Sequence, residues 1–155
     1  MNQRLTAAAL LIALISGGAS AADKSEACPY TAAELNTALG FAVDEGQGSE
    51  MPYPGGKILS CQYRGKGKAS FAVTQMRTAK PSDAQQVAKG LQGQAIAGDT
   101  DGAIWVTMMG NANSISLSYV RGATHSEATV TGINSRNDAE ATPIRERLQK
   151  LRRVP

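Results

Sequence analysis

The chain has 155 residues, with 16 Lys and Arg against 13 Asp and Glu for a net charge of +3. That length suits one ordinary domain with a real hydrophobic core, and so small a net charge does not indicate a nucleic-acid partner. The two cysteines and one histidine are too few for a structural zinc site, which uses four such ligands, and we expect no metal or cofactor.

The first 21 residues are predicted to be an export signal. Arg4 supplies a positive start, residues 5–15 form an apolar run, and Ala19-Ser20-Ala21 is a small-residue cleavage site. The apolar run has eleven residues, whereas a membrane-spanning helix needs about 20. We therefore expect cleavage, a single domain over residues 22–155, no stable membrane insertion, and a periplasmic or secreted location.

Cys28 and Cys61 are predicted to form a disulfide. Ser25-Glu26-Ala27 before Cys28 is not a lipobox and lies beyond the apolar run, so the chain is not expected to be a lipoprotein. A nucleophilic cysteine needs a nearby base and a reducing compartment, and an exported protein rarely has the second. An even cysteine count in an oxidising compartment favours the disulfide.

The first predicted elements are a helix, a loop and a hairpin. Thr31 fits an N-cap with Glu34 completing a capping box, so residues 31–39 are predicted to be a helix that ends at Gly40. Residues 44–57 contain four glycines and two prolines and are predicted to be a loop. Two strands, 58–64 and 69–77, then flank a glycine turn.

A second helix and hairpin follow. Ser82 or Asp83 would cap a helix that ends near Leu91. Strands 103–110 and 114–122 flank the turn "GNAN". In the second of these strands, Ile115, Leu117 and Tyr119 alternate with serines. Residues 123–134 alternate only weakly, which leaves an edge strand and a loop both open. Thr142 and Pro143 predict the start of a C-terminal helix that runs to about Arg153.

The order helix, strand, turn, strand therefore occurs twice, at residues 31–77 and 82–121. Two such α-β-β units can pair their strands into one antiparallel sheet. The predicted fold is α+β, with helices packed on one face of that sheet and an additional C-terminal helix. Coincidence is the alternative to duplication, because hairpins with glycine turns are common.

The segments "CPYTAAELNTALG" and "CQYRG" resemble a pattern found in small exported bacterial domains of unknown function. The doubled α-β-β layout is similar to that of the beta-lactamase inhibitory proteins, which are secreted binders built from a tandem repeat. The likeness to those inhibitors is one of layout, since they carry more cysteines. It implies a disulfide-stapled α+β domain and no particular activity. The matching residues are Cys28, Thr31, Glu34, Gly40, Cys61 and Tyr63.

No strong catalytic motif is present in the sequence. A hydrolase that needs a histidine base would have to use His125, which lies in a polar segment without a G-x-S-x-G elbow. Asp99 and Asp101 in "GDTDG" resemble a fragment of a calcium loop, and an Asx turn before the next strand explains both. A small secreted hydrolase using His125 or the two aspartates is the alternative to a binding protein.

We expect a non-catalytic binding module, such as an inhibitor, an immunity-type protein or an envelope accessory factor with a protein partner. Exposed loops on a rigid scaffold would carry the contacts. Met51 and Tyr53 are apolar groups among glycines and prolines, and the hairpin tip "YRGKGK" is basic. The candidate partner-binding residues are Met51, Tyr53, Arg64, Lys66 and Lys68.

Overall fold

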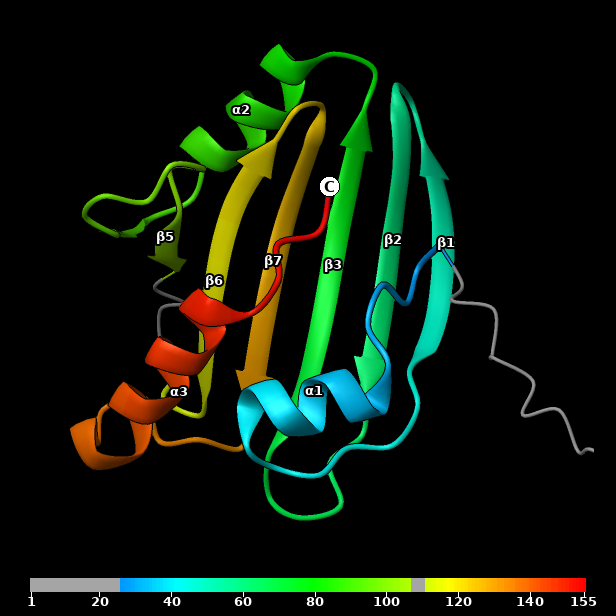
Figure 1. The fold of residues 1–155 in the computed structure, drawn as a ribbon. Coiled ribbons are helices and arrows are strands. Elements are labelled where there is room, and N and C mark those ends of the chain that lie inside the picture. Colours follow the sequence, from blue (N-terminus) through cyan, green and yellow to red (C-terminus); the bar gives the residue numbers. More distant parts are fainter. Residues whose placement is uncertain (1–25, 107–110) are drawn as a thin grey trace, which may run out of the picture.

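The computed structural model describes residues 26–106 and 111–155, so the predicted export signal lies outside the described residues. They form one antiparallel seven-stranded sheet, in the order β1-β2-β3-β7-β6-β5-β4, with three helices (Figure 1). The predicted α+β class and the C-terminal helix are confirmed. The elements are α1 (Ala32–Leu39), β1 (Gln47–Tyr53), β2 (Gly56–Tyr63), β3 (Ser70–Thr78), α2 (Pro81–Lys89), β4 (Gly93–Ala95), β5 (Ile104–Val106), β6 (Ser114–Arg121), β7 (Thr124–Thr131) and α3 (Asp138–Lys150).

The main core lies between one face of the sheet and helices α1 and α3. Successive side chains of a strand point to opposite faces, and in β3 Phe71 and Val73 are buried on this side. The helices contribute Leu35 and Leu39 from α1 and Leu148 from α3. We call this side of the sheet the core face.

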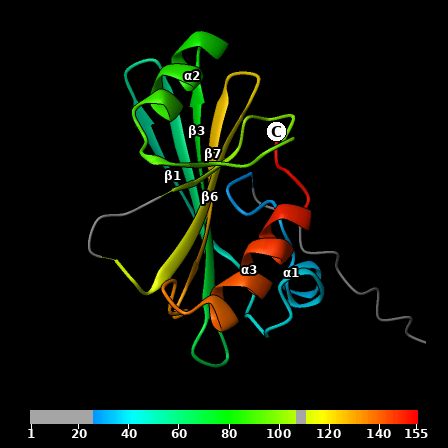
Figure 2. The same cartoon turned by 90° about the vertical axis from the view of Figure 1, so that its left-hand side faces the viewer.

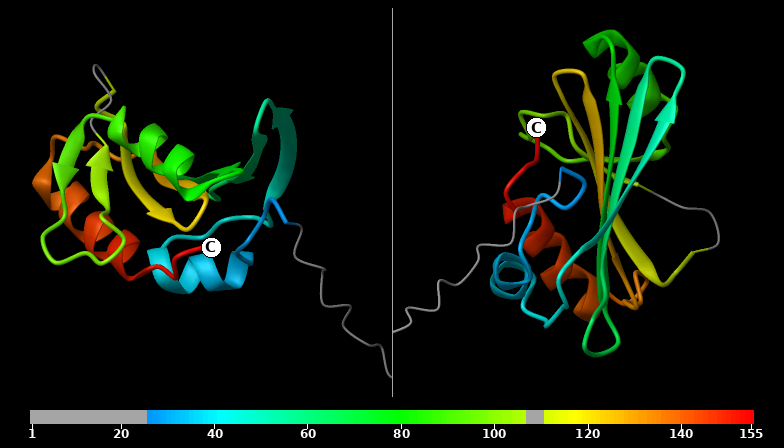
Figure 3. Two further views of the ribbon diagram at one scale, coloured as in Figure 1. Left: turned by 90° about the horizontal axis from the view of Figure 1, so that it is seen from above. Right: turned by 90° about the vertical axis from the view of Figure 1, so that its right-hand side faces the viewer.

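The opposite side is the open face, and α2 covers only one end of it. Figures 2 and 3 show α1 and α3 on one side of the sheet and α2 on the other. The predicted packing of all helices on one face therefore differs from the structure. Along each strand, side chains on the open face alternate with the buried side chains of the core face. On the open face, the exposed residues include Gln62 of β2, Thr74 of β3 and Thr131 of β7. Because α1 and α2 lie on opposite faces, the two α-β-β segments do not occupy equivalent positions.

The predicted disulfide is present between Cys28 and Cys61. It ties the segment before α1 to β2, where Cys61 is fully buried. Beside it, the Tyr63 hydroxyl donates to the Tyr30 carbonyl at 2.9 Å and accepts from the Tyr30 amide at 3.2 Å. The start of the described chain is therefore held on the core face by a covalent bond and by a buried tyrosine.

The predicted loop at residues 44–57 is wrong, because most of it forms strand β1 and the turn into β2. Tyr53 pairs with Gly56 around a two-residue turn in which Gly55 has a φ of +94°. Glycine and proline argue against a central strand, but both are tolerated in an edge strand such as β1. Counting glycines and prolines therefore missed this strand.

Residues 123–134, left open as an edge strand or a loop, contain a central strand. β7 pairs with both β3 and β6 over its full length. Its alternation is weak because Ser126 and Thr124 lie on the buried side among apolar residues. Hydroxyl groups in core positions conceal the pattern on which strand prediction depends.

The ends of two helices also differ from the predictions. α2 starts at Pro81 with Lys80 as N-cap, and neither Ser82 nor Asp83 is the N-cap residue. α3 starts after Asn137, whose side chain accepts from the Ala139 amide, so Pro143 lies inside the helix. The predicted cap of α1 is confirmed, since the Thr31 hydroxyl accepts from the Glu34 amide at 3.2 Å and Gly40 ends the helix.

Candidate functional site

The structure does not gather the five predicted partner-binding residues into one place. Met51 and Tyr53 lie next to the turn between β1 and β2, whereas Arg64, Lys66 and Lys68 lie beyond the other end of β2. Tyr53 pairs with Gly56, seven residues from Tyr63, a span of roughly 23 Å at strand spacing. The five predicted residues therefore form two groups at opposite ends of one hairpin.

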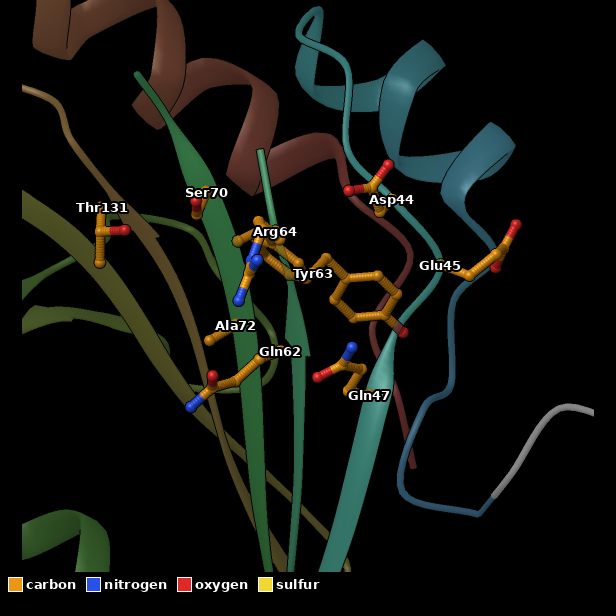
Figure 4. A pocket seen from close by; sticks show the side chains of 10 residues that line it. Asp44, Glu45, Gln47, Gln62, Tyr63, Arg64, Ser70, Ala72 and Thr131 are labelled. Atoms are coloured by element: carbon orange, nitrogen blue, oxygen red, sulfur yellow. The ribbon is translucent and has the colours of Figure 1, made fainter. Parts of the chain in front are cut away.

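A cavity of about 380 Å³ lies at the Arg64 end of this hairpin (Figure 4). Its lining comes from the start of β1, the end of β2, the start of β3 and the last residue of β7, which the sheet register brings together. We call it the hairpin cavity. Its lining residues are Asp44, Glu45, Gln47, Gln62, Tyr63, Arg64, Ser70, Phe71, Ala72 and Thr131.

The backbone beside the hairpin cavity is held by a tight set of contacts. Val43 and Gly65 form an isolated bridge, the Asp44 amide donates to the Arg64 carbonyl at 2.9 Å, and the Gly65 amide donates to the Ser70 hydroxyl at 3.0 Å. A Cβ at Gly65 would lie 1.5 Å from the Ala69 carbonyl oxygen. Glycine is therefore required at position 65, and these backbone contacts hold the chain in place where the hairpin tip begins.

Both acidic groups of the hairpin cavity have partners of their own. The Asp44 carboxylate lies 3.5 Å from the Lys66 ammonium, and the Glu45 carboxylate accepts from the Ala32 amide at the first turn of α1 at 3.3 Å. In contrast, the Arg64 guanidinium has no hydrogen-bond or ion-pair partner among residues 26–106 and 111–155, and in Figure 4 it points away from both carboxylates. The cavity therefore offers one uncompensated cation.

The two aromatic residues of the lining belong to the core and present no open ring. Tyr63 is fully buried and Phe71 is 1% exposed. Burial raises the pKa of Tyr63 to about 12, so its hydroxyl remains protonated as the donor to Tyr30. Besides the two carboxylates, the exposed polar groups of the lining are the Gln47 and Gln62 amides, the Thr131 hydroxyl and the Arg64 guanidinium.

The other end of the hairpin carries a shallower groove of about 340 Å³, between the β1–β2 turn and α2. Tyr53, Met76 and Val87 line it, and the Tyr53 hydroxyl donates to the Arg77 carbonyl at 3.4 Å. Met51 lies on the same face of β1 and is 58% exposed, and among the described residues it is the one large hydrophobic side chain that is exposed.

His125 is not the solvated loop histidine that its polar neighbours suggest. It lies in β7, is only 7% exposed, and its Nε2 is 2.8 Å from the hydroxyl of Ser118, which is 1% exposed. Burial lowers the pKa of His125, and the nearby Glu127 carboxylate partly opposes that shift. The pairing of β6 with β7 brings Ser118 to His125, and no sequence motif signals it.

The predicted Asx turn at Asp99 is confirmed. Its Oδ1 accepts from the amides of Asp101 and Ala103 at 2.9 and 3.2 Å. Asp99 Oδ2 is 2.9 Å from Arg153, and Asp101 Oδ2 is 2.9 Å from Arg121. Both carboxylates therefore serve the turn and its ion pairs. Across the described ranges, no group of three His, Cys, Asp or Glu side chains could hold a metal ion.

No protein-family model matches the chain, and no curated protein is significantly similar to it in sequence. The helices of the described ranges are all too short or too polar to cross a membrane. The residues of the hairpin cavity that the sequence analysis missed are Gln47, Gln62, Ser70 and Thr131. As polar residues on four different strands, they share no linear signal, and only the register joins them.

Proposed function

We propose that the chain is an exported, non-catalytic binding module that takes a protein partner at the hairpin cavity and the adjoining open face. The observation that carries the proposal is Arg64, a cation without a partner among the described residues, in the lining of a cavity of about 380 Å³. An uncompensated cation at a formed cavity favours an acidic group on a partner. The Cys28–Cys61 disulfide supports export, since disulfides persist in oxidising compartments.

The part of the open face that no described helix covers supplies the surface around this cavity. On the open face α2 contacts β3, β6 and β7 at one end only, and Gln62, Thr74 and Thr131 stay exposed toward the other end (Figure 2). Antiparallel sheets commonly leave one face to water, so exposure alone is ordinary. Continuity between this polar face and the cavity lets one partner contact both.

The test is capture of partners from periplasmic extract and secreted proteins, followed by titration of each purified candidate. Arg64→Gln removes the charge at the cavity, and Arg136→Gln is the matched control because Arg136 is an exposed arginine that does not line the cavity. Binding that weakens about tenfold with the first variant and stays unchanged with the second supports the proposal. Equal affinity for both variants places the function elsewhere.

The alternative is a small hydrolase, and the Ser118–His125 pair is the observation that favours it. A serine nucleophile needs an adjacent base and access for the substrate. The base is present, but Ser118 is 1% exposed in the middle of a strand. Hydrolysis of chromogenic esters by the purified chain, abolished by both Ser118→Ala and His125→Ala, would replace the binding proposal with the enzymatic one.

A further inference from the structure

Among residues 26–106 and 111–155, no strand pairs with the outer edge of β1. β1 is the terminal strand of the sheet, and its first six residues are exposed. Proline in an edge strand sits where its missing N–H would face away from the sheet. Pro52 therefore faces outward, and because antiparallel pairing alternates, the backbone groups of Glu50 and Gly48 face the same way.

The side chains of β1 connect the two groups of predicted binding residues. Gln47 lines the hairpin cavity, and Met51, four residues later, lies on the same face of the strand. Only Ser49 lies between them on that face, and it is small and exposed. A strand added along β1 would thus place one side chain at the cavity and another, four residues away, on Met51.

The charges around this edge favour an acidic segment. Arg64 lies without a partner among the described residues at the cavity end, and Lys68 is exposed on the tip beyond it. The one carboxylate of β1, on Glu50, lies 3.6 Å from the Lys57 ammonium on the core-face side. A carboxylate arriving at Arg64 therefore meets a cation, and the nearest carboxylates are already paired with Lys66 and with the Ala32 amide.

We propose that β1 binds an extended acidic segment of a partner protein by strand addition. The segment places an Asp or Glu side chain in the hairpin cavity at Arg64 and an apolar side chain, four residues away, on Met51. This proposal rests on the binding function above and names its partner chemistry. Backbone pairing supplies affinity and alternate side chains supply specificity in such complexes. A sugar acid is disfavoured because both aromatic rings of the lining are buried.

The experiment uses fluorescently labelled peptides of about seven residues, long enough for one strand. The first has Glu and Leu four residues apart in a threonine-rich host. The second has Gln in place of Glu, and the third has the same composition with Glu and Leu adjacent. Each is titrated into the disulfide-bonded chain and into Arg64→Gln, Met51→Ser and the control Arg136→Gln. Amide chemical shifts of β1 locate the complex.

The expected result is that the first peptide binds about tenfold more tightly than the other two, with shifts at Gly48 and Glu50. Arg64→Gln should remove the preference for the first peptide over the second, which has Gln in place of Glu. Met51→Ser should weaken binding of the first peptide. Arg136→Gln should change neither. Met51 is exposed, so its replacement leaves the fold intact.

The inference would be overturned by no binding of any peptide, by binding that ignores Arg64, or by tighter binding of glucuronate oligomers than of the first peptide. Dimerisation of the chain through β1 would also overturn it, since the edge would then serve a second copy. Partner capture that depends on Arg64 without any peptide binding would leave the proposed function standing and remove only strand addition.

Discussion

The imidazole Nε2 of His125, on β7, lies 2.8 Å from the hydroxyl of Ser118 on β6, and both side chains are buried. The pocket lining beside Ser118 includes Ala88 and Lys89 of α2, so this pair lies beneath the helix on the open face. Burial in such a place disfavours the charged form of the imidazole and lowers the pKa of His125.

This burial predicts that the protein loses stability in acid. The pKa of His125 is lowered from its ordinary 6.5 by burial, so below that pH the unfolded chain binds a proton that the folded chain does not. The free energy of unfolding should therefore hold above about pH 6.5 and fall as pH drops below it. Urea unfolding at several pH values measures it. His125→Gln, which does not titrate, should flatten this slope; identical slopes for both proteins would contradict the assignment.

Two buried serines are expected to respond oppositely to replacement by alanine. Ser118 bonds His125, whereas the hydroxyl of Ser126 is buried with no partner in the described chain. Ser118→Ala should cost about 1 kcal/mol of unfolding free energy or more, because it leaves the imidazole nitrogen unpaired. Ser126→Ala removes an unsatisfied group and should be neutral or stabilising. Paired denaturation curves check this, and equal losses would point to an ordered water on Ser126.

Reducing the disulfide should destabilise the domain strongly. Cys28 and Cys61 are 33 residues apart, and closing a loop of that length stabilises by about 4 kcal/mol in the chain-entropy model. The oxidised protein should be lighter than the dithiol by two hydrogens in mass spectrometry, and a reductant should lower its melting temperature. Labelling of both thiols in unreduced native protein would contradict the bond.

Replacing Met51 by alanine and replacing Tyr53 by alanine should change the stability of the protein by different amounts. Met51 is 58% exposed, so Met51→Ala should change stability by less than about 0.5 kcal/mol. Tyr53 is half-buried in the groove beside α2 and its hydroxyl donates to the Arg77 carbonyl. Tyr53→Ala should therefore cost about 1 kcal/mol or more. Thermal unfolding of the single variants tests this, and equal melting temperatures would refute the packing of Tyr53.

The segment after α3 shows how much the core depends on contacts that no local pattern contains. The Tyr30 hydroxyl donates to the Arg152 carbonyl at 2.7 Å, and the Val154 amide donates to the Tyr119 hydroxyl at 3.0 Å. Val154 is fully buried. These contacts join residues more than thirty positions apart, and they carry the chain from α3 across the core face (Figure 1).

The features that rest on local chemistry could be predicted from the sequence. Thr31 and Gly40 mark the ends of α1 because cap preferences act within a few residues, and the strand predicted at 69–77 lies within one residue of β3. The disulfide followed from cysteine count. Tertiary structure decided the place of β7, the strand character of β1 and the side of the sheet that α2 covers.

The hairpin cavity and the Ser118–His125 pair likewise required the tertiary structure. Gln47, Gln62 and Thr131 meet because the strand register places residues from distant parts of the chain on one face. Each is an ordinary polar residue in its own segment. The free energy that sets this register comes from burying the opposite, core face, and a one-residue slip would exchange the two faces. The polar site therefore owes its geometry to apolar residues with which it has no sequence motif in common.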